Sequence, residues 1–171
     1  PADRRLLQCA AAIGREAPLD ILAAVAEEPA VPLPGSVSRL VAAELVHQAR
    51  TVAGSVCVFK HALTRETAYA SIPDHERPDL HRRIFAALEA LPHREQTDEI
   101  ERLAHHAFRA GAWDRAVGYL RQAGDRAFPR WANGEAEERF MQPLAALEQW
   151  PSSRTRTELG IDLRLSLRDP L

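Results

Sequence analysis

The chain has 171 residues, of which 46% are hydrophobic and 27% charged, and its formal net charge is -2. This length fits one large domain or two small ones, and the composition excludes disordered and collagen-like proteins. The near-neutral charge argues against a surface built mainly to hold nucleic acid or anionic lipid.

No run approaches the roughly 20 apolar residues of a membrane-spanning helix, and no secretory signal opens the chain. We therefore expect a soluble, cytoplasmic protein with no membrane partner. The chain begins at Pro1 without an initiator methionine, and we expect it to be a piece of a longer protein. Cys9 and Cys57 are too few for a disulfide framework and lack metal-site spacing, which predicts buried, reduced thiols.

Residues 1 to 72 form the first predicted domain. Apolar residues recur at helical spacing in three stretches that breakers separate, 6–13, 18–26 and 36–45. Two β-branched runs around Ala53-Gly54-Ser55 predict a two-stranded hairpin, with strands at 45–49 and 56–59. A fourth helix is expected over 61–71. Three helices followed by a two-stranded wing is the order of a winged-helix domain.

Residues 73 to 171 form the second predicted domain, and their pattern is helical. Helices are expected at about 78–91, 97–110, 116–127 and 132–149. Small and apolar residues between Leu103 and Ala123 have the spacing of a tetratricopeptide (TPR) helix pair, although Ala107 stands where a larger aromatic is usual. The sequence therefore predicts a mainly α protein, a winged-helix-like domain followed by an incomplete TPR-like array.

The C-terminal segment supports two interpretations. Apolar and polar residues alternate from 159 to 167, which favours a strand, while Leu159, Leu163 and Leu167 also form a helical row. The array context favours the helix, and the strand remains open. Just upstream, an acidic cluster predicts a solvated helix face: Glu135, Glu137 and Glu138.

The motifs of several enzyme classes are missing from the sequence. It contains no phosphate-binding GxxxxGK[ST] or GxGxxG loop, no GxSxG elbow, no HExxH motif and no CxxC pair. We therefore expect no catalytic residue, no bound cofactor or metal, and no nucleotide hydrolysis or cyclisation by this chain.

Two pairs of histidines are candidate metal ligands. His105 and His106 are adjacent, and neighbours on a helix point in different directions, so we expect one packed and one exposed side chain. His75 and His81 are six residues apart, a spacing that does not align side chains on a helix. We expect both on the solvated surface.

The stretch from Val58 to Ser71 enters a helix directly from the wing strand, and it is one of several short pieces that follow one another along nearly the whole chain. These pieces are Leu6-Leu7-Gln8 to Ile13-Gly14-Arg15-Glu16, Arg39-Leu40-Val41-Ala42-Ala43-Glu44-Leu45, Phe59-Lys60-His61-Ala62-Leu63, Leu80-His81-Arg82-Arg83-Ile84, Leu103-Ala104-His105-His106 and Ile161-Asp162-Leu163-Arg164-Leu165. Together they resemble the signal-transduction ATPases with numerous domains (STAND), in the bacterial branch fused to class III adenylate/guanylate cyclase domains or to LuxR-type helix-turn-helix regulators. The resemblance implies the segment after the nucleotide-binding domain, whose parent would bind ATP or ADP with Mg.

The resemblance also implies a role for His61. In relatives such as apoptosome and plant resistance proteins, a Met-His-Asp motif at the start of this helix places a histidine against the β-phosphate of ADP. His61 matches that histidine by position, whereas Lys60 and Ala62 depart from its flanks. An imidazole N–H at a helix N-terminus adds a donor where the dipole already favours phosphate. The alternative is that His61 only caps or packs at the wing junction.

We therefore expect a non-catalytic regulatory and interaction segment, in which the winged helix couples nucleotide state to a TPR-like sensor array. Its partners would be the upstream nucleotide-binding domain, further helical repeats downstream, and a protein or small-molecule effector.

The sequence gives weaker support to two other functions. One is a DNA-binding winged-helix regulator with a helical dimerisation tail. Its recognition helix would offer Arg39 but also Glu44, and residues 1 to 72 carry seven basic and seven acidic side chains, so we expect weak or no nucleic-acid binding. The other is an enzyme in its own right, which the missing motifs oppose.

Overall fold

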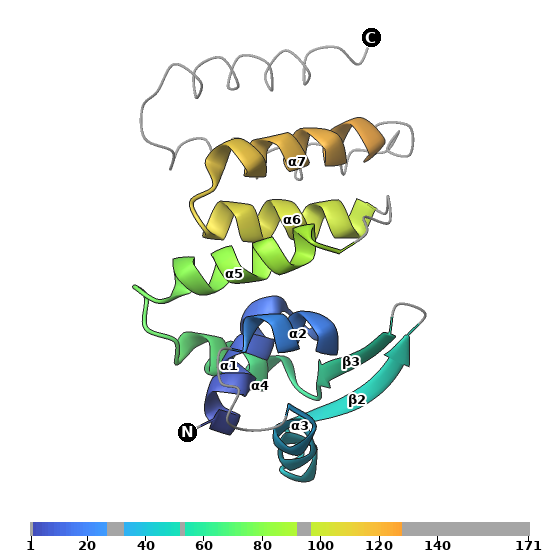
Figure 1. Ribbon diagram of the computed structural model, residues 1–171, viewed down its shortest axis with the longest axis vertical. Coiled ribbons are helices and arrows are strands. Elements are labelled where there is room, and N and C mark those ends of the chain that lie inside the picture. Colours follow the sequence, from blue (N-terminus) through green and yellow to red (C-terminus); the bar gives the residue numbers. More distant parts are fainter. Residues whose placement is uncertain (1, 27–32, 52–53, 92–96, 128–171) are drawn as a thin grey trace. The chain divides into compact units, whose positions relative to one another are not determined.

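The computed structural model describes residues 2–26, 33–51, 54–91 and 97–127 (Figure 1). The chain divides into two compact units, residues 1–91 and 92–171, and each is described by itself. The predictions for 132–149 and 159–167, and for Glu135, Glu137 and Glu138, lie outside the described residues. None of the described helices is long and apolar enough to cross a bilayer.

The first unit combines helices with a small sheet. Its elements in chain order are α1 (Ala2–Ile13), β1 (Glu16–Pro18), α2 (Leu19–Val25), α3 (Leu33–Ala42), β2 (Val46–Thr51), β3 (Gly54–Phe59), α4 (Ala62–Ala70) and α5 (Arg77–Glu89). The prediction of a mainly helical chain is confirmed for the described residues. The sequence pattern places α5 in the second domain, whereas in the structure α5 packs against α1 and α2.

The sheet has three antiparallel strands in the order β1-β3-β2, so the prediction that the sheet has only the two strands of the hairpin is wrong. The hairpin is present and longer than expected, with Thr51 opposite Gly54 at its tip. The missed strand, β1, pairs Glu16 with Val58, about 40 residues away along the chain. Three residues are too short to show a period of two, and only pairing with β3 holds them extended.

The central strand β3 is buried on both faces. Val56, Cys57, Val58 and Phe59 are each at most 8% exposed, which explains why this run is apolar without alternation. Cys57 and Cys9 are both buried, reduced cysteines, as predicted. Burial raises the pKa of the Cys57 thiol to about 11, so at neutral pH it is an uncharged core residue.

Helix α1 lies at the centre of the first unit. Every residue from Gln8 to Ile13 is buried, and the helix contacts α2, α3, α4, α5 and β1. Small side chains such as Ala10, which has no exposed surface, let these elements approach closely. Burial of Leu6 and Ile13, which are 5% and 4% exposed, stabilises the fold by roughly 1.5–3 kcal/mol each.

Polar contacts join α1 to the turn between α4 and α5. The Gln8 amide nitrogen donates to the carbonyl oxygen and the hydroxyl of Ser71, at 3.2 and 2.9 Å. Arg5 forms an ion pair with Glu76 at 2.7 Å. Because Gln8 is only 6% exposed, its two hydrogen bonds offset the cost of removing the amide from water.

Two helices end in the same hydrogen-bond motif with different residues at the turn. After α3, Glu44 N–H donates to Val41 and Leu45 N–H donates to Leu40. After α6 (Thr97–Arg109), the corresponding residue is Gly111. Its φ is +74° and that of Glu44 is +59°. This Schellman geometry favours glycine, so Glu44 occupies a position that strains its backbone.

The second unit begins with a pair of packed helices, α6 and α7 (Trp113–Ala127). Their buried residues include four of the small and apolar positions that the sequence indicated, Leu103, Ala104, Ala107 and Ala116, and also Ile100 and Val117. At the turn, the rings of Phe108 and Trp113 meet edge to face with centroids 5.0 Å apart.

Candidate functional site

His61 lies where strand β3 passes into helix α4. It is the N-cap residue of that helix, with extended backbone angles of -132° and 137°, and its side chain makes no capping hydrogen bond. The side chain is exposed. A helix N-terminus leaves backbone N–H groups without intrahelical partners, so an exposed imidazole stands here beside donors that suit an anion.

Two loops meet the chain just before His61. Phe59 N–H donates to the carbonyl oxygen of Arg15, at 3.1 Å, and Lys60 N–H donates to that of Leu45, at 3.2 Å. The Lys60 ammonium is 3.9 Å from a carboxylate oxygen of Glu44. The turn after α1 and the turn after α3 therefore fix the backbone at the start of α4.

Arg39, the cation of the candidate DNA-recognition helix, is bound within the protein. Its guanidinium donates two hydrogen bonds to the Asp3 carboxylate, both 2.7 Å long, and a third to the Ser36 hydroxyl. The hydrogen bonds from Arg39 are the main cause that lowers the pKa of Asp3 to about 2, and the one to Asp3 raises the pKa of Arg39. Arg39 thus has a bidentate partner on α1.

His81 is buried, whereas His75 is exposed, so the expectation of two surface histidines is wrong for His81. The Tyr69 hydroxyl lies 2.9 Å from His81 Nε2, and the Arg77 guanidinium lies 5.1 Å from the Tyr69 ring centroid. The signal was available in the sequence, because His81 falls in the apolar stripe of α5 with Ile84, Phe85 and Leu88.

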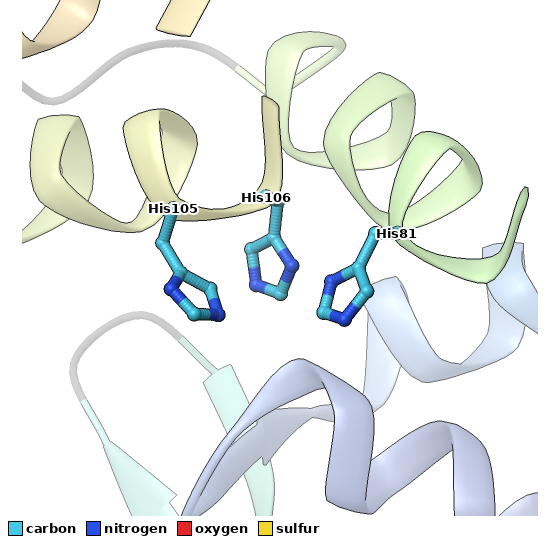
Figure 2. A group of neighbouring side chains, drawn as sticks. All are labelled: His81, His105 and His106. Atoms are coloured by element: carbon cyan, nitrogen blue, oxygen red, sulfur yellow. The ribbon is translucent and has the colours of Figure 1, made fainter. Parts of the chain in front are cut away.

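His105 is exposed and His106 is buried, which confirms the prediction of one exposed and one packed histidine. Their rings nevertheless meet edge to face with centroids 5.2 Å apart. Adjacent positions on this helix therefore still allow the two rings to be in contact. Figure 2 draws both side chains on α6, together with His81 on α5.

Desolvation lowers the pKa of His105, and the positive charge of Arg109 acts in the same direction. Although part of the His105 side chain is exposed, its ring lies close enough to neighbouring atoms to lose hydration. Both effects favour the neutral imidazole over the imidazolium.

No family model and no solved structure matches the chain. An uncharacterized protein of Rhizobium meliloti (strain 1021) is 32% identical to it over 113 residues. These residues are 66% of this chain and 11% of that protein, so the chain is similar to a short part of a much longer relative.

Proposed function

We propose that the chain is a non-catalytic regulatory and interaction segment of a cytoplasmic multidomain ATPase of the STAND type. Its first unit would be the winged-helix domain that couples nucleotide state to a TPR-like array begun by α6 and α7. The order helix, strand, two helices, hairpin, with the sheet order β1-β3-β2, supports this proposal. So does the similarity to a small part of a long protein.

The observation that carries the proposal is the position of His61. An exposed imidazole without a capping bond, at the N-terminus of α4, is free to donate to a phosphate held by an upstream domain. Its role would be to favour the ADP-bound state, because a ligand shifts a conformational equilibrium only through differential affinity. The array would then dock further repeats and a protein or small-molecule effector.

The DNA-binding alternative loses its main cation. Arg39 is held by Asp3 and Ser36, so contact with a base edge would require breaking a bidentate ion pair. The balanced charge of residues 1 to 72 gives no compensating electrostatic attraction.

The first test is the upstream coding sequence, which should encode a phosphate-binding loop. In the full-length protein, His61→Ala should weaken ADP binding by roughly ten-fold to more than a hundred-fold, because one hydrogen bond to a charged phosphate is worth about 1.5–3 kcal/mol. ATP binding should change less.

His47→Ala is the matched control, since His47 is also exposed but lies on β2. It should leave both affinities unchanged. Equal ADP affinity in the wild type and His61→Ala would exclude the sensing role. A loss of more than about 1 kcal/mol in the stability of the 171-residue chain would instead make His61 a structural residue.

A further inference from the structure

Helix α6 brings two imidazole rings together near its C-terminal end. His105 and His106 each offer a ring nitrogen within 4.8 Å of the other, and their ring planes are inclined at 83°. Figure 2 shows both side chains leaving α6 toward the same side. We propose that this pair is a binding site for a divalent cation of the zinc class.

The ligand chemistry fits such an ion. Neutral imidazole nitrogen suits zinc, cobalt, nickel and copper, whereas magnesium and calcium prefer oxygen. Zinc–nitrogen bonds of about 2.0–2.1 Å place two nitrogens of a tetrahedral site roughly 3.4 Å apart. In the structure the two ring nitrogens lie within 4.8 Å of each other, so metal binding requires the two rings to approach further. Water or a further ligand would fill the remaining positions.

Some charges along α6 favour the binding of a cation and others oppose it. The helix ends at Arg109, so the negative end of its dipole lies near the pair and favours a cation. Glu101, one turn before His105, adds negative charge on that side of the helix. Arg102 and Arg109 oppose binding. The two imidazoles therefore supply most of the affinity, and either substitution should be costly.

The test is a titration of the full 171-residue chain with Zn²⁺, measured by calorimetry, and with Co²⁺, followed by its visible absorption. We expect one ion per chain, and a melting temperature that rises with Zn²⁺ and falls back on addition of a chelator. His105→Gln and His106→Gln should each weaken binding at least ten-fold, and the double variant should show no site.

His75→Gln is the control, because His75 is a highly exposed histidine outside α6. It should keep the wild-type affinity. Since His106 is buried, the exposed His105→Gln variant decides the result if His106→Gln does not fold. The proposal would be overturned if His105→Gln bound Zn²⁺ as tightly as the wild type. It would also be overturned if His75→Gln lost as much affinity as His105→Gln.

Discussion

Glu44 has a positive φ of 59°, at the turn where α3 gives way to β2. Its side chain contributes little in compensation, because the carboxylate is 84% exposed and lies 3.9 Å from the Lys60 ammonium. The unfavourable conformational energy of this turn therefore lies in the backbone of Glu44 alone.

Glu44→Gly should stabilise the protein by about 0.5–1 kcal/mol, because glycine removes the clash between Cβ and the backbone at positive φ. Gly111→Ala is the converse variant at the equivalent position after α6 and should destabilise by roughly 1 kcal/mol. Urea unfolding of the three proteins measures both effects. A less stable Glu44→Gly protein would show that the carboxylate, or a stiffer unfolded chain, outweighs the strain.

The ion pair between Asp3 and Arg39 should contribute to the pH dependence of the free energy of unfolding at acid pH. The pKa of Asp3 is lowered from 3.8 to about 2 in the folded state, so the folded state binds this proton less readily than the unfolded state does. The contribution of the pair is complete above about pH 4 and is lost as the pH falls toward 2.

Between pH 5 and pH 2, the urea midpoint of the wild type should fall more steeply than that of Asp3→Asn. Asparagine keeps the shape of the side chain but has no proton to bind. Parallel curves for the two proteins would show that the pair does not persist in solution.

At the scale of elements, α6 and α7 each have a small residue, and the two positions differ in the room for a larger side chain. Ala107 has no exposed surface, whereas Gly118 is exposed on α7 and a Cβ added there would meet nothing within 4 Å. Close packing determines which side chains fit at position 107. At position 118 the low helix propensity of glycine lowers the stability of the helix.

Ala107→Leu should destabilise by about 1–3 kcal/mol because the added atoms must displace close neighbours. Gly118→Ala should stabilise by about 0.5–1 kcal/mol. Thermal and urea unfolding of both variants test the pair of predictions. A tolerated Ala107→Leu would mean that this helix pair accepts the larger side chain usual at that position in TPR repeats.

The sequence predicted those elements whose own residues carry a periodic pattern. Helices α1, α5 and α6 show apolar stripes, and the β2–β3 hairpin shows a turn between two β-branched runs. Strand β1 could not be found in this way, because its only reason to be extended is a partner about 40 residues away. The contact between Arg39 and Asp3 likewise depends on how α3 packs on α1, and no local pattern specifies it.

At the scale of the whole molecule, the charge balance decides what the chain attracts. The net charge is -2, and the first unit's candidate recognition helix has its arginine bound internally. We predict that duplex DNA binds more weakly than micromolar at near-physiological salt, and that Arg39→Ala changes this affinity by less than about two-fold. Fluorescence anisotropy with random and candidate duplexes measures it. Submicromolar binding that Arg39→Ala abolishes would favour the DNA-binding alternative.

The central position of α1 has a consequence for synthesis on the ribosome. Within the first unit this helix is synthesised before the elements that cover it, and its contacts extend to α5, which ends at Glu89. A short isolated helix is only marginally stable in water, so α1 leaves the exit tunnel with its apolar surface uncovered. It must wait for about 75 further residues, which at roughly 5–20 residues per second takes several seconds. During that interval the apolar surface of α1 is accessible to chaperones, and the folded unit then buries it.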